Sequence, residues 1–238
     1  MPTSSTSLPI YIQISELLTR EITAGLYAAG DRLPPEAELA AKLGVAVGTL
    51  RKALAELEER GLLERRQGSG TYVRALGADK SDVRHGVYGF FKLELLRGAG
   101  LPTASVIDFQ KIVTPASFVE SFTRQCYRVR RLRSLGGLPV AIEEIYFDAR
   151  HAVDLKIEDL GEALYLFYRE RLGFWIARAE DHVGIGAVPD WSPTLFAPSV
   201  GSVCSRVERV SWSGKGFIEE YSVTWFDPDR CRYVNRMR

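Results

Sequence analysis

The sequence predicts an α+β protein in two parts: an N-terminal winged helix-turn-helix and a C-terminal domain built on an antiparallel sheet. Helical periodicity and glycine-terminated segments fill residues 1–74, whereas strand-like runs dominate residues 87–238. Between them, residues 75–86 have little periodicity and mixed charge, which is typical of a linker. A chain of 238 residues is long enough for each part to bury its own core.

The first predicted element is an amphipathic helix over residues 9–24, which Gly25 ends. Tyr11 and Gln13 fall outside its apolar stripe. The stripe consists of Ile10, Ile14, Leu17, Leu18 and Ile22.

Residues 33–73 predict a short helix, a tight turn, a second helix and a two-stranded hairpin. Leu39 and Leu43 recur at helical spacing before Gly44, a residue that often ends helices in a left-handed conformation. Beyond the turn, one apolar face is formed by Leu50, Ala53, Leu54 and Leu57. Two helices joined by so short a turn are typical of a helix-turn-helix.

The charges on the second of these helices indicate a nucleic-acid partner. Arg51 and Lys52 lie near its N-terminus, while Glu56, Glu58 and Glu59 lie towards its C-terminus. This order opposes the helix macrodipole, so it is explained if the N-terminal end faces phosphates. The alternative is a helical hairpin whose charges are merely solvated.

A basic hairpin follows directly and is positioned to act as a wing on the DNA backbone or minor groove. We therefore expect double-stranded DNA as a partner. The expected contacts are Gly48, Thr49, Arg51, Lys52, Arg65, Arg66, Gln67, Gly68, Ser69 and Gly70.

Composition supports a globular protein and gives no global nucleic-acid signature. The net charge is +1, and residues 1–74 hold nine basic and nine acidic residues, so any attraction to DNA must come from one face. No run of about 20 apolar residues indicates a membrane span, and the N-terminus lacks the pattern of a signal peptide. The three cysteines are scattered without a C-x-x-C motif. We expect a cytoplasmic location.

The C-terminal part reads mainly as strands, with hairpins expected at residues 136–137 and 214–216. One helix is predicted at residues 157–172. The strand-like runs are residues 105–113, 127–135, 138–147, 174–188, 202–212, 217–226 and 232–237. No alternation of strands with helices suggests a parallel sheet, so an antiparallel α+β domain is expected.

Alternation along residues 127–135 places Arg131 and Arg133 on an otherwise apolar strand face. Buried guanidinium groups need an anionic partner, which can be a ligand or a neighbouring carboxylate of the protein. A two-residue turn at residues 136–137 pairs Arg131 with Ile142 and sends Glu143 to the opposite face. A longer loop or a bulge brings Glu143 beside the arginines, and the sequence does not decide between the two registers.

The N-terminal motifs resemble those of the GntR family of bacterial transcription regulators. The matching segments are P-I-Y-I-Q-I at residues 9–14, G-D-R-L-P at residues 30–34 and R-R-Q-G-S-G-T-Y-V at residues 65–73. Three positions depart from the family pattern: Pro35 replaces a serine, and Ala37 and Val47 each replace an arginine. DNA binding is still expected, but the operator sequence should differ from the usual one.

The C-terminal part resembles the UTRA effector-binding domain of the HutC-type subfamily, whose fold is similar to chorismate lyase. The resemblance lies in R-L-R at residues 131–133, P-V-A-I-E at residues 139–143 and E-Y at residues 220–221. It implies that Arg131, Arg133 and Glu143 line an effector pocket. The further candidates are Phe91, Lys92, Ala163, Glu220 and Phe226. Ala163 stands where the family usually has a serine, and G-F-F-K at residues 89–92 replaces a hydroxyl-rich segment.

Enzymatic function is not favoured by any motif. His85, His151 and His182 are isolated in sequence, and G-S-G at residues 68–70 lacks the lysine that follows a phosphate loop. We expect neither a cofactor, a metal nor a catalytic residue.

The sequence therefore predicts a homodimeric, effector-responsive regulator, a repressor that a small anionic metabolite releases from an inverted-repeat operator. Two alternatives remain open: a lyase-like enzyme domain tethered to DNA, and a ligand-independent DNA-binding dimer.

Overall fold

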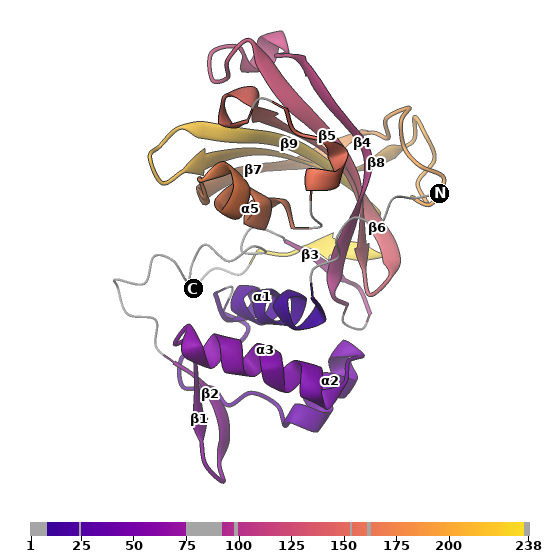
Figure 1. The fold of residues 1–238 in the computed structure, drawn as a ribbon. Coiled ribbons are helices and arrows are strands. Elements are labelled where there is room, and N and C mark those ends of the chain that lie inside the picture. Colours follow the sequence, from indigo (N-terminus) through magenta and orange to yellow (C-terminus); the bar gives the residue numbers. More distant parts are fainter. Residues whose placement is uncertain are drawn as a thin grey trace. The chain divides into compact units, whose positions relative to one another are not determined.

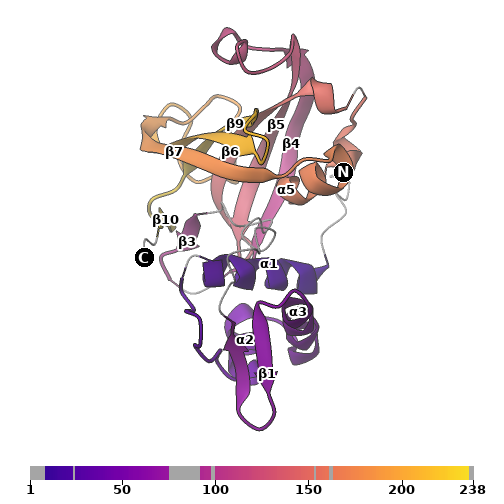
Figure 2. The same ribbon diagram turned by 90° about the vertical axis from the view of Figure 1, so that its left-hand side faces the viewer.

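The structure, a computed structural model, describes residues 9–23, 25–74, 92–97, 100–152, 154–160 and 163–235. The chain forms two compact units, one from Thr103 to Cys231 and the other from the described residues up to Pro102 together with those from Arg232 onward. Figures 1 and 2 show the elements of each unit. The predicted linker at residues 75–86 lies outside the described residues.

The N-terminal unit contains the predicted helix-turn-helix and wing. Its elements are α1 (Ile10–Thr23), α2 (Glu36–Leu43), α3 (Val47–Glu59), β1 (Leu63–Arg66) and β2 (Gly70–Val73). The strands pair antiparallel, with Leu63 opposite Val73 and Arg66 opposite Gly70. The predicted apolar stripes converge in one core that includes Ile14, Leu18, Leu39, Leu50 and Leu57.

Local sequence explains where these helices begin and end. Gly44 has φ +66° at the end of α2, a conformation that glycine adopts without steric cost. Pro35 stands at the N-cap and makes no side-chain capping hydrogen bond, while Glu36 and Glu38 place negative charge in the first turn. Two expectations for α1 are wrong: Gln13, placed off the apolar stripe, is only 4% exposed, whereas Ile10, placed on it, is 52% exposed.

The N-terminal unit also contains a short strand that the sequence did not predict, β3 (Leu93–Leu95), which pairs with β10 (Cys231–Tyr233). The backbone N–H of Val234 donates to the carbonyl of Lys92 at 2.8 Å, just beyond the ends of the two strands. The strand predicted at residues 232–237 is therefore shorter than expected within the described residues.

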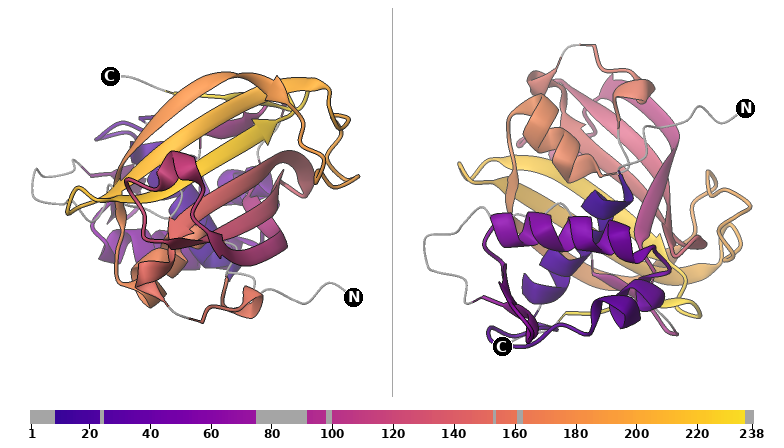
Figure 3. Two further views of the ribbon diagram at one scale, coloured as in Figure 1. Left: turned by 90° about the horizontal axis from the view of Figure 1, so that it is seen from above. Right: turned by 60° about the horizontal axis from the view of Figure 1, so that its bottom comes forward.

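The C-terminal unit is built on a six-stranded sheet in the order β4-β5-β6-β9-β8-β7. All six predicted runs within it are strands. They are β4 (Pro102–Val113), β5 (Gln125–Leu135), β6 (Leu138–Asp148), β7 (Ile176–Ala187), β8 (Val203–Ser213) and β9 (Ile218–Phe226). Pairing is antiparallel from β5 through β9 and β8 to β7. The strands twist across the sheet, as Figure 3 shows.

The continuous helix predicted over residues 157–172 is wrong. A 3-10 turn, η3 (Ile157–Asp159), comes first, followed by α5 (Leu164–Phe167) and the π-helical turn η4 (Tyr168–Leu172). Leu160 and Ala163 both have extended backbone conformations, which interrupt the helical path that their apolar spacing suggested. Two more 3-10 turns complete the unit, η1 (Ala116–Phe118) and η2 (Ala149–His151).

Each face of the sheet carries a distinct set of side chains. One face packs an apolar cluster in which Trp225 and Ile142 contact Phe196 and Val188 from the connection between β7 and β8. On the other face, Tyr168 is fully buried against Phe147, with ring centroids 5.3 Å apart. No helix in the described part of the chain is long and apolar enough to cross a membrane.

Candidate DNA-contacting surface and effector pocket

The N-terminal end of α3 presents most of its predicted contact residues to solvent. Gly48 is exposed and Thr49 half-buried, while the Arg51 side chain is 62% exposed. Lys52 is also exposed, but its ammonium group lies 4.0 Å from the ring centroid of Tyr11 on α1. Arg51 and Lys52 therefore lie on different sides of the helix.

A single carboxylate on α2 holds two of the predicted arginines. Glu36 accepts a hydrogen bond from Arg51 Nε at 2.6 Å and a second from Arg65 of the wing. The hydrogen bond from Arg51 is the main cause of a lowered pKa at Glu36, opposed by partial burial. Because both guanidinium groups remain more than half exposed, each can exchange this partner for a phosphate at small cost.

The wing is a tight hairpin whose tip is solvent-exposed. Gly68 has φ +71°, and Gln67 beside it is exposed. Ser69 Oγ lies 2.7 Å from the hydroxyl of Tyr72, and the guanidinium of Arg66 stacks 4.4 Å from the same ring. These contacts join the turn of the wing to Tyr72 of β2, and the basic side chains of β1 remain exposed.

Arg32 joins this surface and was missed in the sequence, because it occupies the variable position of the G-D-x-L-P motif. It is exposed, and its backbone forms an isolated bridge with Tyr72. A Cβ added at Gly70 would lie 2.7 Å from Arg32 Nε, so glycine at that position leaves room for the guanidinium. Arg32, Glu36 and Arg65 line a groove of about 330 Å³ between α2 and the wing.

In the C-terminal unit, a β-bulge decides the register that the sequence left open. Arg131 lies opposite Glu143 and Arg133 opposite Ala141, with the shift between Arg133 and Ser134. Directly opposed residues share a face of an antiparallel sheet, so Glu143 lies on the same face as both arginines.

Glu143 forms a buried ion pair with the two arginines. Its Oε2 accepts from Arg131 Nη2 at 2.6 Å and from Arg131 Nε at 3.1 Å, and its Oε1 lies 3.8 Å from Arg133 Nε. Both arginine side chains are about 95% buried, with exposures of 6% and 5%. Burial opposes the charged form of Glu143, yet the two guanidinium groups lower the pKa of this carboxyl.

Glu220 occupies a different environment on the same face. It accepts hydrogen bonds from Tyr168 at 2.8 Å and from Tyr165 at 3.0 Å, both on the short helical segment above the sheet. Ser211 donates at 3.3 Å. Burial is the largest effect here and raises the pKa of Glu220, even though the hydroxyl groups favour its charged form.

A third arginine on this face was not predicted. Arg209 Nε and Nη2 bind the two oxygens of Asp181 at 2.5 and 2.7 Å. Arg209 lies opposite Ser222 of β9, and Ser222 lies opposite Ile145 of β6. Because Ile145 and Glu143 are two residues apart on β6, Arg209 lies on the same face as Glu143, in the neighbouring row of side chains. The alternation of Val207, Arg209 and Ser211 along β8 is the sequence pattern from which the position of Arg209 on this face could have been predicted. The face thus carries two buried arginines, one half-buried arginine and three buried or half-buried carboxylates.

The central strands supply hydroxyl groups to this face, in addition to the position of Ala163, where the family's hydroxyl is absent. The pairing of β6, β9 and β8 places Ser205, Ser222 and Thr224 on the arginine-bearing face, and all three are half-buried. The open part of the face carries Val183 and Ile185, which are 57% and 73% exposed. Hydroxyl donors supplied by the central strands were not visible in the motifs that flank the pocket.

The remaining effector candidates divide between the units. Ala163 is buried at the N-cap of α5, and Phe226 is buried on the arginine face opposite Ala141. Lys92 lies in the N-terminal unit and does not belong to this cluster. Phe91 lies outside the described residues.

Side chains that could suggest catalysis have ordinary surroundings. His151 lies 2.6 Å from Glu219, and exposed His182 lies 2.9 Å from Glu180, whereas His85 is outside the described residues. The three cysteines are free and buried. No group of His, Cys, Asp and Glu in the described part of the chain could hold a metal ion.

Comparison with known proteins matches both units to families. Residues 10–73 match the bacterial regulatory proteins of the gntR family, and residues 100–232 match the UTRA domain. The HTH-type transcriptional regulator SmoD of Agrobacterium fabrum is 50% identical over 98% of this chain and 97% of its own length.

A more distant relative is the mannosyl-D-glycerate transport/metabolism system repressor MngR of Escherichia coli, which is 27% identical over 95% of each chain. Among solved structures, a possible transcriptional regulator, YydK, from Bacillus subtilis has a TM-score of 0.54 and 21% identity, covering 96% of this chain and 99% of its own.

Proposed function

Because the chain belongs to the GntR family of bacterial regulatory proteins and carries a UTRA domain, it is a DNA-binding transcription regulator, and we propose that it acts as a metabolite-released repressor. The observation that carries the proposal is the buried cluster of Arg131, Arg133 and Glu143 on one face of the sheet. Two relatives named as repressors, MngR and NagR, support the direction of control.

The DNA contacts are proposed to come from the surface formed by α3 and the wing. Arg51 reads bases in the major groove, and Arg32, Arg65 and Arg66 contact phosphates. The exposure of these side chains and their weak hold on Glu36 support this assignment. One such unit offers few base contacts, so the regulator binds as a homodimer to an inverted repeat, with half-sites about one helical turn apart or less. Such a regulator acts on chromosomal DNA in the bacterial cytoplasm.

The effector is proposed to be a small hydroxylated carboxylate, such as a sugar acid. Arg131, Arg133 and Glu143 together carry one net positive charge, which suits a single carboxylate. Ser205, Ser222 and Thr224 supply hydroxyl partners for the rest of the ligand. MngR is named for mannosyl-D-glycerate, a glycoside whose glycerate part bears a carboxylate, and this supports the same class.

The deciding experiment is a titration of fluorescein-labelled operator with the full-length protein, with and without candidate metabolites. A sugar acid should release the operator, because it binds the DNA-incompetent dimer more tightly. A sugar phosphate of equal size should act more weakly. Arg133→Ala should abolish the response and leave operator affinity unchanged in the absence of metabolite.

Three other outcomes would replace this proposal. Conversion of a metabolite to product indicates an enzyme tethered to DNA. Operator binding that ignores every metabolite indicates a ligand-independent regulator. Tight binding of a neutral sugar that survives both Arg131→Ala and Arg133→Ala shows that the arginines are structural.

The wing has a separate test in the salt dependence of binding. Replacing Arg65 and Arg66 with Ala should weaken binding to operator and random DNA alike and reduce the slope of log K against log salt by roughly one to two. A loss confined to the operator would mean that these residues read bases.

A further inference from the structure

A cavity lies in the C-terminal unit, formed by residues outside the cluster of Arg131, Arg133 and Glu143. Its volume is about 400 Å³, within the range of small-molecule sites. It is enclosed by η2, by the turn from η4 into β7, and by the hairpin between β8 and β9. The side chains that matter here are Arg150, Phe174, Trp175, Lys215, Phe217 and Glu219.

A β-bulge directs a carboxylate into this cavity. Ser211 pairs with Glu220 and Trp212 with Ile218, so Glu219 is an extra residue in β9. Its side chain is only 4% exposed. Bulges often re-aim a side chain beside a functional site. Glu220, the next residue, contacts Tyr165 and Tyr168 in the proposed effector pocket. The side chains of Glu219 and Glu220 therefore lie in two separate sites.

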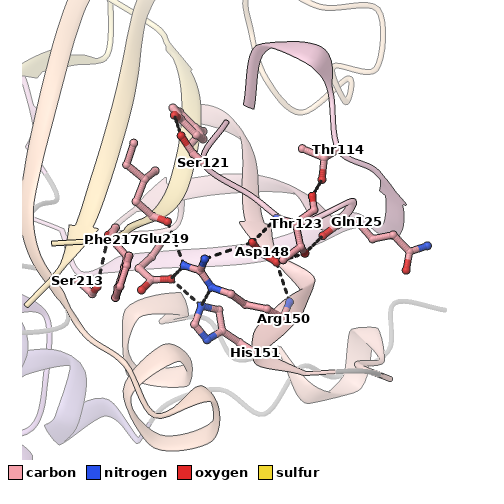
Figure 4. Close-up of polar contacts among 12 residues, drawn as sticks. Thr114, Ser121, Thr123, Gln125, Asp148, Arg150, His151, Ser213, Phe217 and Glu219 are labelled. Atoms are coloured by element: carbon pink, nitrogen blue, oxygen red, sulfur yellow. Dashed lines mark hydrogen bonds and ion pairs between the residues drawn. The ribbon is translucent and has the colours of Figure 1, made fainter. Parts of the chain in front are cut away.

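Glu219 is held by partners from η2, as Figure 4 shows. Arg150 Nη2 donates to its Oε2 at 2.7 Å, and His151 Nε2 lies 2.6 Å from the same oxygen. Arg150 Nη1 also lies 3.6 Å from Asp148, which the hydroxyl of Thr123 contacts at 2.5 Å. The charge of Arg150 is therefore largely matched, and it serves as a fixed wall of the cavity.

The cationic group that remains for a ligand is Lys215, at the tip of the β8–β9 hairpin. It is exposed, and within the part of the chain that the structure describes it has no ion-pair partner. With Arg150 and Glu219 paired, Lys215 gives the cavity lining one net positive charge. This favours an anionic ligand.

The apolar walls are aromatic and partly open. Trp175 is 42% exposed and Phe217 is 59% exposed, while Phe174 behind them is buried. The indole of Trp175 lies against the backbone of Gly214, where an added Cβ would be 3.0 Å from Cζ2. Because Gly214 has no side chain, the indole ring can lie directly against the backbone. Exposed aromatic faces beside a cation favour a planar ring with an attached anion.

We propose that this cavity is a second ligand site, for a small aromatic carboxylate whose ring packs on Trp175 and Phe217 and whose carboxylate pairs with Lys215. The site has a direct route to the effector pocket. Phe174 in the cavity wall stacks on Tyr168 at 4.8 Å, and Tyr168 donates to Glu220. A ligand bound in this cavity can therefore shift Tyr168, which forms part of the proposed effector pocket.

The test uses the full-length protein and para-fluorobenzoate, observed by fluorine NMR line broadening. Saturable binding is expected with a dissociation constant on the order of 1 mM, as for a fragment of this size. Trp175→Ala should weaken it roughly tenfold through lost ring packing. Lys215→Met should weaken it about two- to fivefold, as expected for an exposed ion pair. Gly214→Ala should also weaken it, because the new methyl group displaces the indole.

Two matched controls separate this site from others. Trp191→Phe alters a tryptophan in the cluster with Trp225 and should leave binding unchanged. Arg133→Ala alters the effector pocket and should also leave it unchanged, so failure of the proposed effector does not affect this result. Circular dichroism and melting temperature confirm that each variant is folded.

The proposal is overturned if binding does not saturate, if Trp175→Ala and Gly214→Ala bind as well as wild type, or if only Arg133→Ala loses binding. Equal affinity for para-fluorobenzyl alcohol would refute the anionic character of the ligand.

Discussion

The two units hold their arginines in opposite ways. In the N-terminal unit, Arg51 and Arg65 share one carboxylate and remain 62% and 59% exposed. In the C-terminal unit, Arg131 and Arg133 are about 95% buried around Glu143. An exposed pair contributes little to stability and is easily exchanged, whereas a buried charge that loses its partner costs several kcal/mol.

This difference fits the ligand that we propose for each surface. On the N-terminal unit, phosphates can replace Glu36, because the guanidinium groups are already hydrated. On the C-terminal face, a ligand must join the existing network and leave Glu143 in place. The first arrangement suits salt-dependent binding to a polyanion, and the second suits selection of one small molecule.

The largest expected effect is on the buried pair. Arg131→Ala should lower the free energy of unfolding of the C-terminal unit by about 3–5 kcal/mol, because Glu143 remains buried without its main partner. All four tryptophans, at positions 175, 191, 212 and 225, belong to this unit, so their fluorescence during urea unfolding reports on it alone.

The triple variant Arg131→Met, Arg133→Met and Glu143→Leu provides the control. It removes all three charges of the buried cluster and should restore much of the lost stability. If Arg131→Ala has the same urea midpoint as the wild type, the ion pair between Arg131 and Glu143 does not stabilise the fold.

The next effect concerns Arg51, whose replacement should leave folding intact. Arg51→Ala removes an exposed side chain that lies off the buried face of α3, so the melting temperature should not change. Specific binding to the operator should weaken by about 1–3 kcal/mol, the cost of a lost base contact. An anisotropy titration measures this, with Arg171→Ala, an exposed arginine of the C-terminal unit, as a control for lost charge. Unchanged operator affinity would remove Arg51 from the interface.

A smaller effect is expected from the carboxylate that holds these arginines. Glu36→Gln removes a negative charge beside the proposed DNA-contacting surface and should strengthen binding to random DNA by up to about 1 kcal/mol at low salt. The gain should shrink as salt is added. Weaker binding to all DNA would mean that Glu36 positions Arg51 and Arg65. The carboxylate of each unit would then have the same role, to hold its arginines in place.

The smallest effect is a pH dependence from Glu220. Burial raises the pKa of this carboxyl, so its contribution to stability is present at low pH and is lost as the pH rises through the folded-state pKa. Glu220→Gln lacks this titration. The unfolding free energy should therefore fall less between about pH 5 and about pH 8 in the variant, by up to ~1 kcal/mol. Glu143, whose pKa is lowered, loses its contribution only below that range.

Equal pH profiles for wild type and Glu220→Gln in urea unfolding would show that Glu220 titrates as an ordinary carboxyl.

The sequence was sufficient for elements with strong local signals. Period-2 alternation and paired glycines predicted the strands, and the stripe of Leu50, Leu54 and Leu57 predicted α3. The broken segment at residues 157–172 was misread because its apolar spacing suits a helix, whereas the backbone at Leu160 and Ala163 is extended.

The composition of the pocket depended on information that is not local. Arg209, Ser222 and Thr224 come from strands that meet Glu143 only through the pairing order of the sheet. Arg32 became visible only when the bridge to Tyr72 brought it beside the wing. Such residues can be predicted only once the register of each strand pair is known.

The bulge between Arg133 and Ser134 has a consequence for how this pocket can change over generations. The number of residues in the hairpin decides which side chains of β6 share a face with the arginines. One residue more or less turns each side chain of the strand to the opposite face of the sheet. Point substitutions can tune the ligand gradually. A single-codon insertion near Gly137 would instead place Ile142 opposite Arg131 in place of Glu143, and would turn an ionic lining into an apolar one in one step.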